Sequence, residues 1–114
     1  MKIGIVIPTY QEEKNIKKIF YKFSRYKKIN FFFCFVDGSY DNNTKIQIKK
    51  YFKRNYKIIS QKKNKIGFFN ISKRCEASSI GFKWLIKNTN AELIVDMDAD
   101  LSSDPKDIFK AIKI

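Results

Sequence analysis

Short, unbroken apolar segments alternate with longer segments of helical periodicity along the whole chain, and this alternation constrains the fold more than any other feature. We predict strands at residues 3–7, ending at Pro8, and at residues 31–36, 57–60 and 92–97. Their apolar, largely β-branched or aromatic residues are typical of strands that are buried on both faces. The predicted apolar helix faces are Ile16, Ile19, Phe20 and Phe23; Ile48, Tyr51 and Phe52; Ile71, Cys75, Ser78, Phe82 and Leu85; and, after Pro105, Ile108, Phe109 and Ile112.

Strands that alternate with helices indicate right-handed β-α-β units and therefore a parallel sheet. We expect an α/β fold, an open parallel sheet of about four strands with helices on both faces. The expected strand order is 3-2-1-4, because polar residues that follow the first and fourth strands can share a ligand only if those strands are neighbours.

The chain has 114 residues, enough for one domain with a hydrophobic core. It contains 24 Lys and Arg against 11 Asp and Glu, which gives a formal net charge of +13. This charge suggests nucleic acid or an anionic membrane as a partner. A second explanation is that the abundant Lys, Asn, Ile, Phe and Tyr are encoded by A/T-rich codons, so that the lysines reflect genome composition.

The two cysteines, Cys34 and Cys75, stand within apolar or helical patterns and lack the spacing of metal ligands. We expect both to be core-filling free thiols in a reducing compartment. The amino-terminal apolar run is too short for a signal peptide, and residues 31–36 fall far below the ~20 residues of a membrane-spanning helix. We therefore expect a cytoplasmic protein, at most peripheral at the cytoplasmic face of a membrane.

Three carboxylates, Asp96, Asp98 and Asp100, stand at alternating positions near the end of the predicted fourth strand. Carboxylates at the end of an apolar strand are costly to bury without a compensating cation. Asp98 and Asp100 can both reach one hard cation, and ligands that are all oxygen favour Mg²⁺ or Mn²⁺, which commonly hold phosphate groups. The alternative is a solvated acidic loop.

Polar residues also follow the first and second predicted strands. Thr9, Tyr10 and Glu12 follow the first, and Asp37 stands at the end of the second. The carboxyl ends of parallel strands meet at one edge of the sheet, where ligands of open α/β sheets bind. The sequence therefore predicts a site for a phosphate-bearing ligand at this edge, although it has neither a Gly-x-Gly-x-x-Gly nor a P-loop motif.

Three segments resemble the motifs of family 2 glycosyltransferases, which have the Rossmann-like GT-A fold. The segments are Pro8-Thr9-Tyr10-Gln11-Glu12, Asp37-Gly38-Ser39-Tyr40-Asp41 and Asp98-Ala99-Asp100-Leu101. The family typically has Pro-Thr-Tyr-Asn-Glu, Asp-Asp-Gly-Ser-x-Asp-x-Thr and Asp-Ala-Asp-Leu in the same order. The stretch from Asp98 to Lys106 is most similar to dolichol-phosphate mannosyltransferases and related polyprenyl-phosphate glycosyltransferases.

The resemblance implies a metal-dependent, inverting transfer of a hexose from a nucleotide sugar to a polyprenyl or dolichyl phosphate at a membrane surface. The expected sugar is mannose, and the expected donor is GDP-mannose or a UDP-hexose. The cofactor would be Mg²⁺ or Mn²⁺, which would neutralise the leaving nucleoside diphosphate.

The resemblance assigns donor binding to side chains at three strand ends. These residues are Pro8, Thr9, Tyr10, Glu12, Asp37 and Asp98. Tyr10 would pack on the nucleoside, Glu12 would accept hydrogen bonds from the base or ribose, and Asp37 would contact the base.

The resemblance also assigns the metal. Asp98 and Asp100 would be the catalytic pair that holds the ion, and Ser102 would add an oxygen ligand. Lys65 or Arg74 would add positive charge near the phosphates; for Lys65, a solvated surface lysine is the alternative.

Two departures from the family pattern affect these expectations. Val36 occupies the position of the first of two adjacent Asp residues, so base recognition would depend on Asp37. Enzymes of this type are also considerably longer. We therefore expect residues 1–114 to be the amino-terminal, nucleotide-sugar-binding part of a GT-A domain, with the acceptor half absent or supplied by a second polypeptide.

Two other functions are compatible with the sequence. The first is a truncated or non-catalytic nucleotide-sugar-binding module that needs a partner half. The second is a basic nucleic-acid-binding protein. Against the second, the aromatic residues fall mostly at core spacing and the usual RNA-binding motifs are missing, so no nucleic acid partner is expected.

Overall fold

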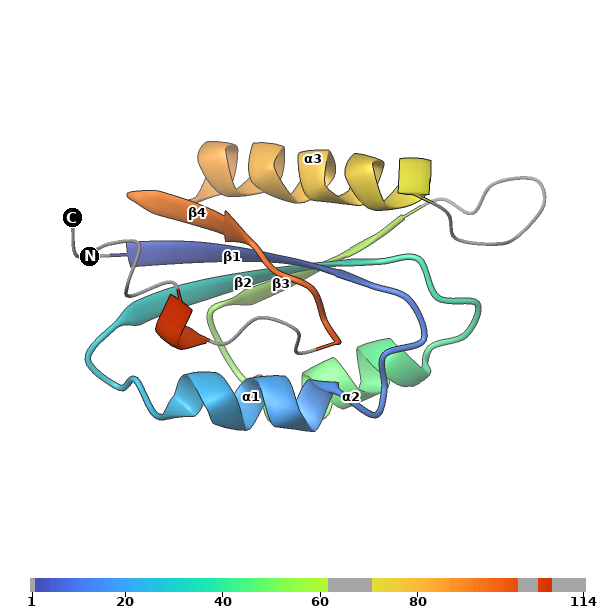
Figure 1. Cartoon of the computed structure of the whole chain (residues 1–114), viewed down its shortest axis with the longest axis horizontal. Coiled ribbons are helices and arrows are strands. Elements are labelled where there is room, and N and C mark those ends of the chain that lie inside the picture. The colour runs from blue at the N-terminus through green and yellow to red at the C-terminus, as the bar shows by residue number, and fades with distance from the viewer. Residues whose placement is uncertain (1, 62–70, 101–104, 108–114) are drawn as a thin grey trace.

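The computed structural model describes residues 2–61, 71–100 and 105–107, except for the side chains of residues 71–74. Its elements are β1 (Lys2–Thr9), α1 (Ile16–Ser24), β2 (Asn30–Asp37), α2 (Asn43–Tyr51), β3 (Tyr56–Ser60), α3 (Ile71–Asn88) and β4 (Leu93–Asp96). The strands are parallel and stand in the order β3-β2-β1-β4 (Figure 1). The expected fold class and strand order are confirmed.

Helices cover both faces of the sheet, also as expected. α1 and α2 lie on one face and α3 lies on the other (Figure 1). Residues 105–107 are helical, as Pro105 predicted, but the expected apolar positions Ile108, Phe109 and Ile112 lie outside the described residues. In the part of the chain that the structure describes, no helix combines the length and the hydrophobicity needed to cross a membrane.

The face covered by α1 and α2 has a core that is largely aromatic. The ring of Phe33 meets those of Phe23 and Phe52 edge to face, with centroids 5.0 and 5.1 Å apart. Such pairs add about 0.5–1.5 kcal/mol each beyond the burial of their surface. This core fixes the positions of α1 and α2 on the sheet.

The close packing of α3 on the sheet depends on small residues. Ala77 and Leu85 are fully buried there, and an added Cβ on Gly81 would lie 2.4 Å from Cγ1 of Val6. The helix therefore approaches β1 closely because Gly81 has no side chain. Cys75 was predicted to face this core; it is exposed, and only Cys34 is the expected buried thiol.

β1 continues through Pro8 to Thr9, so the predicted strand end at Pro8 was wrong. The oxygen of Val6 accepts the N–H of Met97 on the β4 side, and the oxygen of Thr9 accepts the N–H of Gly38 on the β2 side. Backbone groups alternate between the two sides, so Pro8 faces the β4 side. β4 pairs with β1 only as far as Val6, and Pro8 is therefore tolerated where no further donor is needed.

Candidate functional site

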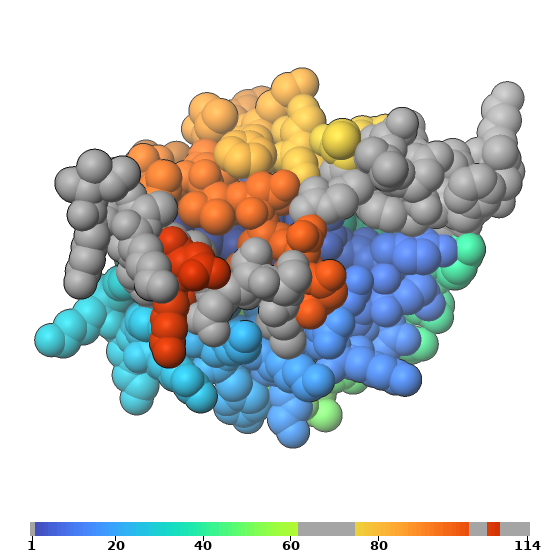
Figure 2. Space-filling view, viewed as in Figure 1, coloured from blue at the N-terminus to red at the C-terminus, as the bar shows by residue number. Residues whose placement is uncertain are grey.

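The last residues of β1 and the residues that follow β1 and β4 form one small pocket at the carboxyl edge of the sheet. The cavity measures about 220 Å³ and is lined by Pro8, Thr9, Tyr10, Glu12, Asp98, Ala99 and Asp100. In Figure 2 the orange segment that follows β4 lies against the blue segment that follows β1. Six of the residues predicted for the site are thus brought together, from positions about 90 residues apart in the sequence.

The pairing of β4 with β1 places the carboxylates. The N–H of Met97 continues the hydrogen bonding to Val6 beyond the end of β4, which brings Asp98 beside the end of β1. Asp96 has a different role, because its Oδ2 accepts a hydrogen bond from Ser78 Oγ of α3 at 3.0 Å. Of the three carboxylates, Asp98 and Asp100 line the pocket and Asp96 does not.

A divalent cation fits this pocket wall chemically. The described residues contain no group of three or more Asp, Glu, His or Cys side chains arranged to hold a metal. Mg²⁺ is usually bound by only one or two carboxylates, with substrate phosphates and water as the remaining ligands. Asp98 and Asp100 match that donor set; Ser102, the predicted third ligand, lies outside the described residues, as does Lys65.

Asp37 ties the ends of β1 and β2 together. Its Oδ1 accepts the hydroxyl hydrogens of Thr9 and Ser39, each at 2.7 Å. The residue is 1% exposed, and Lys45 Nζ lies 3.8 Å from Oδ2. Oδ2 has no hydrogen-bond partner among the described residues. The predicted contact of Asp37 with a base stays a prediction.

Two further hydroxyl groups hold the loop that follows β1. Ser39 Oγ accepts the N–H of Gln11 at 2.8 Å, and Thr44 Oγ1 accepts the N–H of Glu12 at 3.1 Å. Gln11 has a φ of 52°, in the left-handed region that favours glycine, so its conformation needs such support. The roles of Ser39 and Thr44 were not predicted; the Asp-Gly-Ser turn was visible in the sequence, but its partner loop was not.

Tyr10 stands beside a second tyrosine at the pocket. The rings of Tyr10 and Tyr40 lie 5.4 Å apart in an edge-to-face arrangement. A side-chain hydrogen bond with Tyr40 raises the pKa of Tyr10 to about 12. Tyr40 is 54% exposed, so its ring is accessible from solvent next to Tyr10.

The position at which the family carries an additional Asp does not face the pocket. Val36 is fully buried in the cluster that packs under α3, together with Val6 and Ala77. Side chains alternate along a strand, so Asp37 points to the opposite face, where it meets Thr9. The departure at Val36 therefore changes the core on the α3 side and leaves the arrangement of Asp37 intact. The side chain of Arg74 is not described.

Comparison with known proteins supports the resemblance. Among solved structures, S. aureus TarS is similar with a TM-score of 0.62 and 20% sequence identity, a likeness that supports the fold alone. The match covers 97% of this chain and 19% of TarS, so the chain spans about a fifth of that protein's length. No curated protein matches the sequence. The sequence model of the family Glycosyl transferase family 2 matches residues 4–114, which is nearly the whole chain. The chain therefore belongs to this family.

Proposed function

We propose that this chain binds the donor of a hexosyltransferase, which transfers mannose from a nucleotide sugar, with inversion, to a polyprenyl or dolichyl phosphate. The observation that carries the proposal is that one pocket brings together side chains from two strand ends: Pro8, Thr9, Tyr10, Glu12, Asp98 and Asp100. The family membership supports a nucleotide-sugar donor and an acceptor. The mannosyl donor and the lipid acceptor rest on the similarity of residues 98–106 to polyprenyl-phosphate enzymes.

The donor would lie with its nucleoside on the β1 side and its diphosphate on the β4 side. The pocket of about 220 Å³ is smaller than the roughly 300 Å³ at which typical ligand sites begin, so it would hold only part of the donor. Tyr10, with Tyr40 beside it, would pack on the base, and Glu12 would accept hydrogen bonds from the base or ribose. We propose GDP-mannose or a UDP-hexose as the donor.

Asp98 and Asp100 would hold Mg²⁺ or Mn²⁺, with Ser102 as a further oxygen ligand. When bound, the ion would neutralise negative charge on the leaving diphosphate. The two carboxylates would hold it at the pocket beside Pro8 and Thr9, and the diphosphate would bind next to it. Lys65 or Arg74 would add positive charge near the phosphates.

A polyprenyl phosphate acceptor suits a site of this kind. Its phosphate is already anionic near neutral pH, so the transfer depends less on a general base than transfer to a hydroxyl would. We propose that the reaction takes place at the cytoplasmic face of a membrane, in which such an acceptor would be anchored. We propose that the acceptor is held outside the pocket described above, by a further part of the protein or by a second polypeptide.

Binding of nucleoside diphosphates tests the donor site. We expect calorimetry to show that Mn²⁺ strengthens the binding of GDP or UDP to the chain by about tenfold or more, and that Asp100→Ala abolishes the metal effect. Glu92→Ala is the matched control, because it removes an exposed carboxylate just before β4, at the opposite end of that strand. Equal affinity of the unaltered chain with and without Mn²⁺ would contradict the proposed metal site.

Transfer of radiolabelled mannose to a polyprenyl phosphate tests the reaction. The chain alone should turn over poorly, because holding the acceptor in line with the anomeric carbon is worth several kcal/mol of the barrier, roughly 7–11 in well-oriented systems. Adding the carboxyl-terminal half of a related enzyme, fused or separate, should increase the rate. Efficient transfer by the chain alone would show that the acceptor site has been misplaced. A complemented protein that binds donor and stays inert would favour the non-catalytic binding module.

A further inference from the structure

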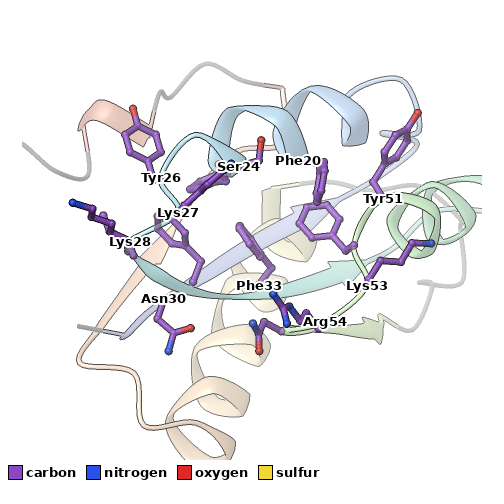
Figure 3. Close-up of a pocket in the computed structure, with 15 residues that line it drawn as sticks. Phe20, Ser24, Tyr26, Lys27, Lys28, Asn30, Phe33, Tyr51, Lys53 and Arg54 are labelled. Atoms are coloured by element: carbon purple, nitrogen blue, oxygen red, sulfur yellow. The ribbon is translucent and has the colours of Figure 1, made fainter.

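A second and larger cavity lies at the opposite edge of the sheet, where α1 and α2 end and β2 begins (Figure 3). Its volume is about 640 Å³, within the range of roughly 300–1,000 Å³ that is usual for small-molecule sites. Ser24, the last residue of α1, and Asn30, the first residue of β2, both line it. Asp37, at the other end of β2, is seven residues away, or roughly 23 Å along an extended strand. The cavity is therefore separate from the donor pocket.

The inner walls of the cavity are aromatic. Phe33 and Phe52 form part of them with their edge-to-face pair, and Phe20 lies against Phe52 with ring centroids 5.2 Å apart. Phe33 and Phe52 are buried by the surrounding core, whereas Phe20 and Tyr51 are only partly buried and so can lend surface to a ligand. An apolar chain is the kind of ligand that such walls accept.

The rim of the cavity is cationic. Figure 3 places Phe33 between Lys27 and Lys28 on one side and Lys53 and Arg54 on the other. All four basic side chains belong to exposed residues, and no Asp or Glu is among the residues that line the cavity. None of the four forms an ion pair with a described residue. Four like charges around one opening attract an anionic group.

We propose that this cavity binds the anion of a fatty acid, with the alkyl chain along the accessible surface of Phe20 and Tyr51 and the carboxylate at the cationic rim. Charge complementarity selects an anionic headgroup, and the guanidinium of Arg54 offers the planar pair of donors that suits a carboxylate. The hollow shape selects a single alkyl chain, because a flat bilayer surface could not enter the cavity. This site is independent of the donor pocket and of the proposed transfer reaction.

Calorimetry with decanoate, kept below its micellar concentration, tests the proposal on the unaltered 114-residue chain. We expect decanoate to bind with a stoichiometry of one, while decanol and acetate bind at least about tenfold more weakly, because each lacks one of the two recognised parts. Decanol that binds as tightly as decanoate would overturn the role of the rim. Tighter binding of decyl phosphate would overturn the choice of a carboxylate, and binding to phosphatidylglycerol vesicles without binding of decanoate would overturn the single-chain ligand.

Two variants at exposed positions locate the ligand without disturbing the core. Arg54→Gln should weaken decanoate binding by about two- to fivefold, as expected for one partly solvated ion pair. Arg54→Lys should restore only part of it, because lysine returns the charge without the planar pair of donors. Ser24→Trp should weaken binding more, because an indole at this lining position fills the cavity. Lys17→Gln removes the same charge from the exposed side of α1, away from the cavity, and should have no effect.

The variants also decide between a specific site and general attraction to a chain of net charge +13. Equal weakening by Arg54→Gln and Lys17→Gln would overturn the proposed rim, since it would show that only the overall charge matters. Unchanged binding in Ser24→Trp, with an unaltered thermal unfolding curve, would place the ligand elsewhere and overturn the site.

Discussion

Thr44→Val is the sharpest test of the hydroxyl groups that hold the loop after β1. Thr44 is fully buried in the first turn of α2, and its Oγ1 accepts the N–H of Glu12 at 3.1 Å and donates to Glu13 Oε2 at 3.4 Å. Valine has nearly the same shape and a similar helix propensity, so the substitution removes the hydroxyl group and little else. Loss of the acceptor for a partly buried N–H costs about 1–3 kcal/mol, and we expect the free energy of unfolding to fall by that amount.

Urea unfolding, followed by the fluorescence of the single tryptophan, measures this change. Ile46→Val, at a position of α2 that is 56% exposed, is the control and should stay within about 0.5 kcal/mol of the unaltered chain. Thr44→Ser keeps the hydroxyl and loses a buried methyl group, at a cost of about 1 kcal/mol. It should therefore lower stability and leave nucleotide affinity unchanged.

Nucleotide binding separates the two substitutions. Thr44→Val should weaken the binding of GDP or UDP about fivefold, equivalent to ~1 kcal/mol, because Glu12 is no longer held beside the pocket. If Thr44→Val unfolds at the same urea concentration as the unaltered chain and binds nucleotide equally well, the hydroxyl does not hold the loop and the reasoning fails.

Four further predictions concern the core and the cysteines. Gly81→Ala should lower the free energy of unfolding by about 1–2 kcal/mol in spite of alanine's better helix propensity, because the new Cβ would meet buried Val6; a stabilised variant would show that α3 lies farther from β1. A thiol reagent should label exposed Cys75 at once and buried Cys34 at least about 100-fold more slowly, and equal rates would contradict the burial of Cys34. Burial raises the pKa of Cys34 to about 11 from the ordinary value of 9.0, so this thiol favours folding below about pH 9 and loses that contribution as the pH rises toward 11. Val36→Asp should cost more than about 3 kcal/mol in urea unfolding because it buries a carboxylate under α3, and an unchanged stability would show that position 36 is not buried.

The strand order could be predicted because two independent signals agreed. Apolar runs located the four strands, and the chemistry of Tyr10 and Asp98 required the first and last of them to be neighbours. Both residues line one pocket, which is the arrangement that the prediction needed. Local sequence predicted the elements here, and the expectation of a shared ligand site predicted how they pair.

The packing of α3 could not be predicted in the same way. Hydrophobic periodicity indicated a face that includes Cys75 and Leu85. Leu85 is buried as predicted, whereas Cys75 is exposed and the buried face contains Ala77 and Gly81 instead. Alanine and glycine carry little hydrophobic signal, yet they allow the helix to approach Val6 most closely. A helix face that packs closely because its residues are small gives no hydrophobic periodicity in the sequence.

The candidate site was likewise predicted only in part. Motifs showed which residues could contact a ligand, such as Asp98, because those residues stand together in the sequence. The contacts from Ser39 and Thr44 to the β1 loop span 28 and 32 residues, and no local pattern reveals them. They follow from the register, in which Thr9 pairs with Asp37: once those two residues lie side by side, the loops that leave β1 and β2 must meet. The hydroxyls of the second loop then accept hydrogen bonds from the N–H groups of the first. The parallel register of β1 and β2 therefore determines the shape of the proposed donor pocket as much as the residues that line it.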